Sequence, residues 1–320
     1  MLEAINLSKK YGQTEAVHKA GFFIKEGEAV GLIGRNGAGK STVMRMLTGY
    51  LAPTEGSVRV FGTNMAEAPH AARRHIGYMP EVPPLYPDLT VREHLLYVAS
   101  LRGFSGTRAR GEAERVSEAL CISDMGRRPI KNLSKGLRQR VGFAAALVGS
   151  PKFMILDEPT AGLDPGQTVE FRRIVASLSG SVSFLVSSHI LSEIASICSR
   201  ILILHGGRIV ANGSPEGIAR EHCGPASVEV EILGPAALAR EVLEDRVGKR
   251  AIVSEERTSQ NTTRFEIALD GERPDDPGLR CAVFAAVAEK RELLSIVTLR
   301  SREHKLEDIF MDLTEHRDER

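Results

Sequence analysis

Apolar runs and helical repeats alternate along the first part of the chain. EAVGLI at 28–33 and FMIL at 153–156 are almost entirely apolar, and SVSFLVSSH at 181–189 contains a third apolar run. Such runs are typical of buried strands. STVMRMLT at 41–48 and TVREHLLYVASL at 90–101 instead repeat their apolar residues at helical spacing. Buried strands that alternate with helices predict an α/β domain.

Helical patterns also occupy much of the stretch from about 82 to 150. Thr90 and Glu93 form a capping box at the start of one helix, and EAERVSEALCI at 112–122 keeps its apolar residues on one helical face. We therefore expect a helical subdomain at about 82–150.

The pattern changes near the end of this first domain. LILHGGRIVANG at 202–213 predicts a hairpin that turns at Gly206 and Gly207, and Gly- and Pro-marked sequence follows it. Beyond about 225 the order is strand, helix, strand, strand, helix, strand, which predicts a small ferredoxin-like α+β sandwich. We expect one domain at 1–222 and an accessory domain at 225–320.

The last apolar pattern of the chain is LEDIFMDLT at 306–314, which reads as an amphipathic helix. Its role is regulatory, dimer-stabilising or simply one of packing on the first domain. No cluster of metal ligands, nucleophiles or phosphate-binding residues occurs in the accessory domain.

Composition narrows the class of protein. The 320-residue chain has 42 Lys and Arg against 41 Asp and Glu, a net charge of +1, so no global basic field indicates nucleic acid and no such partner is expected. The four cysteines lie far apart without a C-x-x-C pair. Their spacing argues against a zinc site or a disulfide framework and favours a reducing, cytoplasmic setting.

Neither a secretory signal nor a membrane span is expected. The start, MLEAINLSKKYG, lacks a long apolar core and a small-residue cleavage site. The longest apolar candidate, VGFAAALVG at 141–149, is shorter than the ~20 residues that a spanning helix needs. Any role at a membrane must therefore come through a partner.

GRNGAGKS at 34–41 carries the first sign of chemistry. It fits G-x-x-x-x-G-K-[ST] at every fixed position and lies between a predicted strand and a predicted helix. Its backbone N–H groups turn around a polyphosphate, Lys40 reaches the β- and γ-phosphates, and the Ser41 hydroxyl ligates Mg²⁺. The predicted nucleotide-binding residues here are Gly34, Arg35, Asn36, Gly37, Ala38, Gly39, Lys40, Ser41 and Thr42.

Two carboxylates follow the strand at 153–156. Successive side chains of a strand point to opposite faces, so Asp157 and Glu158 have different roles. Asp157 is placed to hold Mg²⁺, usually through its water shell, and Glu158 to polarise an attacking water. His189, at the same sheet edge, is a candidate γ-phosphate sensor. The alternatives are an acidic strand end and a structural histidine.

Two capped helix starts complete the pattern. Ser134 in LSKGLRQR is an expected N-cap, and a capped helix start is an anion site. Asp164 and Pro165 in AGLDP form a cap and first-turn pair. Taken alone, each feature says only that a helix begins there.

Together and in this order, these motifs resemble the nucleotide-binding domain of ABC transporters over about residues 1–220. Tyr11 matches the aromatic residue that stacks on adenine. GRNGAGKS matches Walker A, LSKGL the signature, FMILDE Walker B, AGLD the D-loop and His189 the switch histidine. The resemblance implies ATP and Mg²⁺ as cofactors, and Glu158, His189 and Lys40 as catalytic residues.

Two motifs depart from the common family pattern. In the Q-loop, GYMPE has Glu81 where Gln is usual, and in the signature Lys135 and Leu137 replace a Gly and a Gln. A carboxylate at position 81 still offers an oxygen to Mg²⁺ or its water, so Glu81 is a predicted metal residue together with Ser41 and Asp157. Lys135 either approaches a partner's γ-phosphate or is an exposed lysine at a helix start.

The resemblance also implies partners. Two such domains pair head to tail, so Ser134 and Gly136 would contact the γ-phosphate of ATP held by a second copy of the chain. The helical subdomain would carry the groove that grips an integral-membrane permease. VPPLYPDL at 82–89 is either that docking surface or a loop packed on its own core. The implied location is cytoplasmic and peripheral, on the inner face of the cell membrane.

The predicted function is the ATP-hydrolysing, energy-coupling subunit of a bacterial ABC exporter that drives a separate permease. The variants at Glu81 and Lys135 are similar to the branch of exporters for gliding motility, polysaccharide and antibiotic resistance. The alternative is a soluble ABC ATPase of translation, repair or cluster assembly, although one phosphate loop and no heptad run disfavour several of these. A P-loop kinase would leave the signature, D-loop and switch histidine unexplained.

Overall fold

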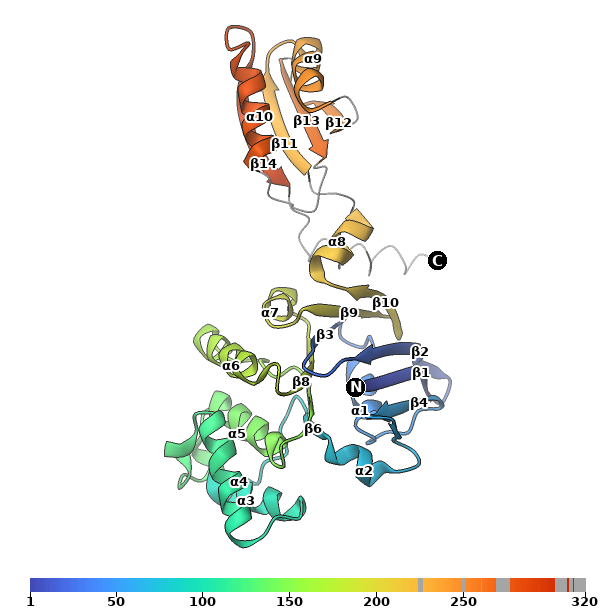
Figure 1. Ribbon diagram of the computed structural model, residues 1–320, viewed down its shortest axis with the longest axis vertical. Coiled ribbons are helices and arrows are strands. Elements are labelled where there is room, and N and C mark those ends of the chain that lie inside the picture. Colours follow the sequence, from blue (N-terminus) through green and yellow to red (C-terminus); the bar gives the residue numbers. More distant parts are fainter. Residues whose placement is uncertain are drawn as a thin grey trace. The chain divides into compact units, whose positions relative to one another are not determined.

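The computed structural model describes residues 1–223, 227–248, 251–259, 261–268, 277–302, 310 and 313. The chain divides into two compact units, of which the first contains Met1–Pro215 and the second Glu216–Asp312. Figure 1 shows both units. The ranges 1–222 and 225–320 for two separate domains stay a prediction.

A six-stranded sheet in the first unit supports the predicted motifs. Its order is β10-β9-β3-β8-β7-β6, parallel except for the β9–β10 hairpin. The strands are β3 (Ala29–Ile33), β6 (Ile76–Met79), β7 (Phe153–Leu156), β8 (Ser183–Ser188), β9 (Arg200–His205) and β10 (Arg208–Gly213). Since β8 lies between β3 and β7, the carboxyl ends of these three strands meet at one edge, where ligands of α/β proteins bind.

A second, antiparallel sheet covers the first helix. Its order is β2-β1-β4-β5, and its strands are β1 (Leu2–Tyr11), β2 (Thr14–Ile24), β4 (Glu55–Val60) and β5 (Thr63–Asn64). The helix α1 (Lys40–Leu47) buries Val43, Met44 and Leu47 in one core with residues of both sheets. Burial from two sides holds the start of α1, and hence the glycine-rich loop, in place.

Helices make up most of the segment between β6 and β7 (Figure 1). They are α3 (Val91–Leu101), α4 (Gly106–Ala119) and α5 (Lys135–Leu147), with the short 3₁₀ helices η1 (Ser123–Met125) and η2 (Ile130–Asn132). The predicted capping box is present, because Thr90 accepts from the backbone of Glu93 and the Glu93 carboxylate accepts from the backbone of Thr90. The remaining helices are α2 (Pro69–Arg74), α6 (Pro165–Leu178), α7 (Leu191–Ala195) and α8 (Pro215–Cys223).

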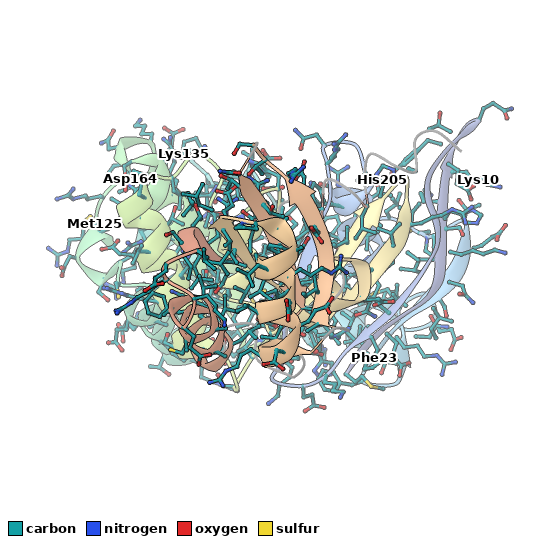
Figure 2. All side chains as sticks on the ribbon, turned by 90° about the horizontal axis from the view of Figure 1, so that it is seen from above. Lys10, Phe23, Met125, Lys135, Asp164 and His205 are labelled. Atoms are coloured by element: carbon teal, nitrogen blue, oxygen red, sulfur yellow. The ribbon has the colours of Figure 1, made fainter. Side chains whose placement is uncertain are left out.

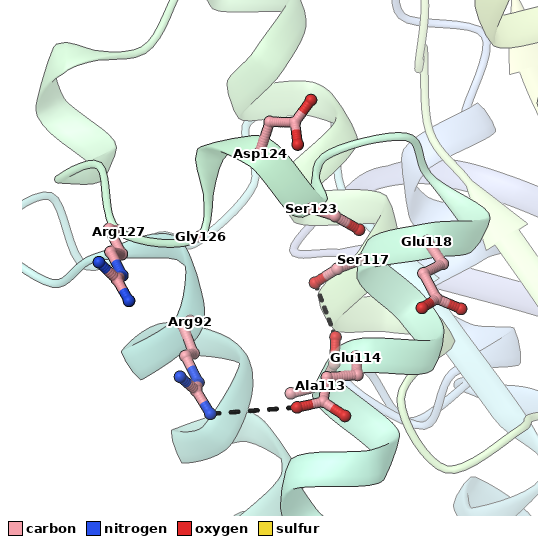
Figure 3. A pocket seen from close by; sticks show the side chains of 9 residues that line it. All are labelled: Arg92, Ala113, Glu114, Ser117, Glu118, Ser123, Asp124, Gly126 and Arg127. Carbon is pink, nitrogen blue, oxygen red and sulfur yellow. Dashed lines mark hydrogen bonds and ion pairs between the residues drawn. The ribbon is translucent and has the colours of Figure 1, made fainter.

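A polar hollow of about 380 Å³ lies between α3 and α4 (Figure 3). Arg92 lies 4.0 Å from Glu114 across it, and the hydroxyl of Ser117 donates to the carbonyl of Ala113. Basic and acidic side chains both line this hollow, and no predicted site residue does.

The second unit has the predicted ferredoxin-like order. Its sheet runs β12-β13-β11-β14 and is antiparallel throughout. The elements are β11 (Ser227–Leu233), α9 (Ala236–Val247), β12 (Ile252–Arg257), β13 (Thr262–Ala268), α10 (Pro277–Ala288) and β14 (Ser295–Arg302). Val230, Phe265 and Val283 are among the residues of its apolar core.

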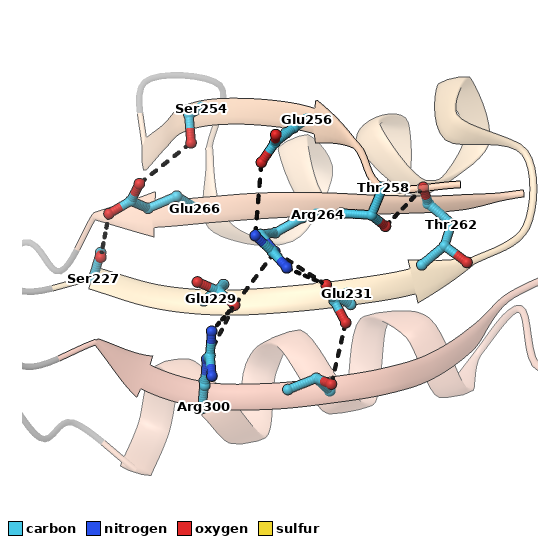
Figure 4. Close-up of polar contacts among 11 residues, drawn as sticks. Ser227, Glu229, Glu231, Ser254, Glu256, Thr258, Thr262, Arg264, Glu266 and Arg300 are labelled. Atoms are coloured by element: carbon cyan, nitrogen blue, oxygen red, sulfur yellow. Dashed lines mark hydrogen bonds and ion pairs between the residues drawn. The ribbon is translucent and has the colours of Figure 1, made fainter. Parts of the chain in front are cut away.

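The other face of this sheet carries ion pairs instead of an apolar core (Figure 4). Glu229 is buried and receives Arg300 at 2.7 Å and Arg264 at 3.5 Å, while Glu231 receives Arg264 at 2.7 Å. Hydrogen bonds from Arg264 lower the pKa of Glu231. The amphipathic helix predicted at 306–314 lies outside the described residues except for Phe310 and Leu313, which are helical.

Candidate nucleotide site

The loop between β3 and α1 has the backbone that a phosphate cradle requires. Gly37 and Gly39 have φ values of 83° and 105°, and a Cβ at Gly39 would lie 2.6 Å from the carbonyl oxygen of Ala16. Side chains are therefore excluded at Gly39 on both conformational and steric grounds. Ser41 and Thr42 follow in the first turn of α1 and are half-buried. The open N-terminus of α1 directs its N–H groups into this loop.

Lys40 is buried and turned back on the loop. Its Nζ donates to the carbonyl of Gly34 at 2.7 Å and lies 3.5 Å from Oε1 of Glu158. A buried ammonium requires such partners, since its desolvation is otherwise uncompensated. Lys40 thus joins the loop after β3 to Glu158 after β7.

The two carboxylates after β7 lie in different surroundings. Asp157 is buried and accepts a 2.7 Å hydrogen bond from the hydroxyl of Ser187. Glu158 has a left-handed backbone, with φ of 46°, and its N–H donates to the same hydroxyl at 2.8 Å. The alternation expected from a strand is thus replaced at Glu158 by a turn, yet the two carboxylates still differ in their partners.

His189 completes a chain of contacts. Its Nδ1 lies 2.9 Å from Oε2 of Glu158, whose other oxygen faces Lys40. The carboxylate of Glu158 is therefore held between a lysine from the loop after β3 and a histidine from the end of β8. The structure brings together all three residues that were predicted to be catalytic.

The signature and the D-loop of the chain contact each other. Ser134 caps α5 by accepting from the backbone of Leu137 at 3.3 Å, and Asp164 caps α6 by accepting from the backbone of Gln167 at 2.8 Å. A Cβ at Gly136 would lie 2.5 Å from the amide oxygen of Gln167.

Lys135 makes a second contact between the signature and the D-loop. A side chain at Gly162, which has φ of 69°, would collide with Nζ of Lys135. Figure 2 shows Lys135 and Asp164 on the same side of the first unit. Lys135 is exposed, and its ammonium lies over the D-loop of its own chain.

Three of the predicted site residues, Tyr11, Glu81 and Ser134, lie apart from this group. Tyr11 ends β1 with 48% of its surface exposed, and Nζ of Lys9 lies 5.7 Å from its ring centre. Glu81 is exposed, and its carbonyl accepts from Gln139 at 3.1 Å. Among the described residues, no hydrogen bond or ion pair joins Tyr11, Glu81 or Ser134 to Lys40 or Glu158.

Sequence reasoning missed Ser187 and Gln167. Ser187 lies inside an apolar run, where a serine reads as a tolerated small residue, and Gln167 lies in the polar first turn of a helix. The only available signal for Ser187 was its place in a strand expected to end at the same sheet edge as Asp157.

Comparison with known proteins identifies the family. The family model described as ABC transporter matches residues 17–161. The bacitracin transport ATP-binding protein of Enterococcus faecalis is 40% identical over 212 residues, 66% of this chain and 68% of that relative. The Nod factor export ATP-binding protein I of Paraburkholderia xenovorans is 31% identical over 98% of this chain and 96% of its own length. A probable multidrug ABC transporter ATP-binding protein of Escherichia coli is 36% identical, and the match spans 38% of that longer relative.

Solved structures agree with the fold of the first unit. An ATP-binding subunit of an ABC transporter superimposes with a TM-score of 0.63 at 32% identity and covers 70% of this chain and 94% of its own. A dimeric ATP-binding cassette in a post-hydrolysis state, bound to ADP and Pi, gives 0.61 at 25% identity and covers 67% of this chain and 98% of its own.

Among the described residues, every helix is too short or too polar to span a membrane.

The ordered motifs, the contacts that converge on Glu158 and the comparisons with relatives agree with one another. The chain is a nucleotide-binding ATPase that belongs to the ABC transporter ATP-binding family and is homologous to its exporter ATPases.

Proposed function

We propose that this ATPase is the energy-coupling subunit of a bacterial exporter, that it works as a homodimer, and that it lies on the inner face of the membrane under a separate permease. The single observation that carries the proposal is the contact of Glu158 with both Lys40 and His189, at 3.5 Å and 2.9 Å. These contacts gather a phosphate-binding lysine, a candidate base and a candidate sensor at one point. Relatives named for bacitracin transport and Nod factor export support the direction of transport.

The residues at this edge fit Mg²⁺. The Ser41 hydroxyl and the Asp157 carboxylate are hard oxygen donors, which Mg²⁺ prefers. Asp157 is buried, and the described residues give it a neutral hydroxyl but no ion-pair partner, so a cation would compensate its charge. The described residues contain no group of three or more His, Cys, Asp or Glu side chains that could hold a metal ion. This is consistent with an ion that keeps several waters and binds mainly through phosphate.

Hydrolysis of ATP to ADP and phosphate requires a water that gives up a proton. Glu158 accepts that proton, and His189 holds the carboxylate by its 2.9 Å contact. Lys40 and the loop N–H groups bind the β- and γ-phosphates, and Mg²⁺ when bound neutralises charge that develops on the phosphate oxygens. A phosphate competes with Glu158 for Lys40, so binding of ATP would free the carboxylate to act as a base.

The second half of each site would come from a second copy of the chain. Ser134 and Gly136 lie at the N-terminus of α5, whose partial positive charge attracts an anion. Among the described residues, no hydrogen bond or ion pair joins them to Lys40 or Glu158, which is consistent with a role toward ATP held by the partner. The dimeric relative bound to ADP and Pi supports this arrangement.

Two adjoining hollows form a groove suited to the permease. The larger, about 540 Å³, is lined by His70, Arg73, Arg74 and Arg102 and, among the described residues, by no carboxylate. The smaller, about 160 Å³, is lined mostly by apolar residues, including Leu85. Both hollows share Tyr78 and Arg102.

The residues that line the groove indicate which kind of permease segment would bind there. Burial and the nearby charge of Asp157 together raise the pKa of the Tyr78 hydroxyl to about 12. Met79, which lines the smaller hollow, accepts a 2.9 Å hydrogen bond from the backbone N–H of Asp157, so the floor of the groove lies close to the carboxylates of the nucleotide site. Tyr50 and Val82 flank it with 77% and 80% of their surface exposed. A short segment of the permease that carries a carboxylate beside apolar residues fits the basic and apolar parts together. The prediction that 82–89 belongs to the docking surface stays part of this proposal.

Charge reversal in the groove tests the permease docking. We expect Arg74→Glu to reduce co-purification with the proposed permease, co-expressed with this chain, by at least about tenfold, because it places like charges at the interface. Arg59→Glu, on an exposed position of β4, is the matched control. Basal ATP hydrolysis by the isolated chain should be unchanged in both variants. Undiminished capture of the permease by Arg74→Glu would contradict the docking surface.

Glu81 offers a separate test of the metal-linked role. We expect Glu81→Gln to raise the Mg²⁺ concentration that gives half-maximal hydrolysis by about threefold to tenfold, because one negative charge near the ion is lost. Glu55→Gln, another exposed position, controls for charge alone. Unaltered turnover and Mg²⁺ dependence would remove Glu81 from the site.

A further inference from the structure

A single buried hydroxyl joins the two carboxylates of the nucleotide site. Ser187 has 0% of its surface exposed, and β8 places it beside β7, one position beyond the Leu156–Val186 pair. Its hydroxyl lies 2.7 Å from Oδ1 of Asp157 and 2.8 Å from the backbone nitrogen of Glu158. No other residue whose contacts are described makes hydrogen bonds to both.

The direction of these two bonds is fixed by chemistry. The backbone N–H of Glu158 can only donate, so it occupies a lone pair of the Ser187 oxygen. A carboxylate can only accept, so the one hydroxyl proton of Ser187 is committed to Asp157. The order Glu158 N–H to Ser187 O–H to Asp157 is therefore unique, and each bond polarises the next.

The two hydrogen bonds have different effects, one on the side chain of Asp157 and one on the backbone of Glu158. One oxygen of Asp157 is pinned by Ser187, which fixes the plane of the carboxyl group and hence the direction of its other oxygen. Glu158 has φ of 46°, a conformation that L-residues other than glycine rarely adopt. The bond from its N–H to Ser187 supports that conformation, which in turn sets where the side chain of Glu158 begins.

We propose that Ser187 is a positioning residue for both carboxylates, orienting Asp157 toward the metal ion and holding the backbone of Glu158 in its left-handed turn. Ser187 has no exposed surface from which to contact a ligand, so it acts through these two residues. The inference rests on the proposed roles of Asp157 and Glu158.

The chain offers a matched control on the same strand. Ser183 is equally buried, at 1% exposed, and its hydroxyl accepts from the backbone N–H of Gly27 at 2.8 Å. It lies at the opposite end of β8 from Asp157. Replacing either serine by alanine removes one buried hydroxyl from β8, but only Ser187→Ala disturbs the carboxylates.

The experiment compares Ser187→Ala, Ser187→Thr and Ser183→Ala in the full chain. Two quantities are measured: the Mg²⁺ dependence of hydrolysis, and the gain in affinity for a fluorescent ATP analogue when Mg²⁺ is added. For Ser187→Ala we expect half-maximal Mg²⁺ to rise and turnover to fall by about tenfold or more, with most of the Mg²⁺-dependent gain in binding lost. Ser187→Thr keeps the hydroxyl and should restore both quantities to within about threefold of the native chain.

Ser183→Ala should lower thermal stability without moving either quantity by more than about twofold. The inference is overturned if Ser187→Ala keeps native Mg²⁺ dependence and native Mg²⁺-dependent binding while losing only as much stability as Ser183→Ala. Failure of the proposed function is distinct, because the native chain itself would then show no Mg²⁺-dependent hydrolysis.

Discussion

Replacing Glu158 by Gln is expected to abolish most hydrolysis while preserving ATP binding, lowering turnover by about 100-fold to 10,000-fold. Glutamine has the shape of glutamate but cannot accept the proton of the attacking water. The contacts of Glu158 with Lys40 and His189 lose their charge but keep their geometry. Phosphate release in a single turnover measures the chemical step directly.

The same variant should trap a dimer. Removing a carboxylate beside the phosphates lowers repulsion with ATP, and without hydrolysis the closed state is not released. Light scattering with ATP, ADP and no nucleotide gives the mass of each species, and we expect a dimer with ATP alone. Glu28→Gln is the control. It removes a carboxylate that lies outside the nucleotide site and pairs with Arg200 at 2.6 Å, and this variant should hydrolyse ATP normally. Normal hydrolysis by Glu158→Gln would refute the assignment of the base.

The sequence predicted the elements that carry a strong local pattern. The apolar runs became β3, β7 and the middle of β8, the capping box at Thr90 starts α3, and the pair Asp164 and Pro165 starts α6. Each of these signals is contained within a few residues, so no knowledge of distant contacts is needed.

The missed features depend on distant contacts or irregular backbone. β1 has Asn6 in a left-handed conformation and two shifts of register between Ala4 and Lys9 against β2, which breaks the two-residue period that identifies a strand. The role of Ser187 requires β8 to lie between β3 and β7, an order that does not follow the chain. The predicted alternation of Asp157 and Glu158 was likewise drawn from a regular strand, whereas Glu158 turns at φ of 46°.

Contacts between α5 and α6 explain why the signature and D-loop would act as one body. Arg140 pairs with Glu170, and the rings of Phe143 and Phe171 lie 5.4 Å apart. The exposed contact of Lys135 with Gly162 adds a third contact at the N-terminal end of α5. A γ-phosphate bound at Ser134 of one copy would therefore also affect the position of the D-loop of that copy. This effect would link the two proposed sites of a dimer.

Replacing Lys40 by Met should remove most of the stability that the folded chain gains from bound nucleotide. The methionine keeps the apolar stem but removes the charge, and loss of charged hydrogen bonds to phosphate costs about 1.5–3 kcal/mol, or about 10- to 140-fold in affinity. Bound Mg-ADP raises the free energy of unfolding of the native chain by mass action, and in Lys40→Met this increase should largely vanish. Thermal unfolding with and without Mg-ADP measures it, and Lys152→Met, at an exposed position, is the control.

The resting contact between Lys40 and Glu158 makes a further outcome specific to this structure. Lys40→Met leaves Glu158, with its side chain only 12% exposed, without the ammonium 3.5 Å away, so the variant should lose stability even without nucleotide. Removing the charge of Glu158 as well should return much of that loss, because no unpaired carboxylate remains. A Lys40→Met and Glu158→Gln double variant that is as unstable as the sum of the two single variants would show that these residues do not interact in the resting protein. Coupling between them would instead mean that the lysine which binds phosphate also holds the base until ATP arrives.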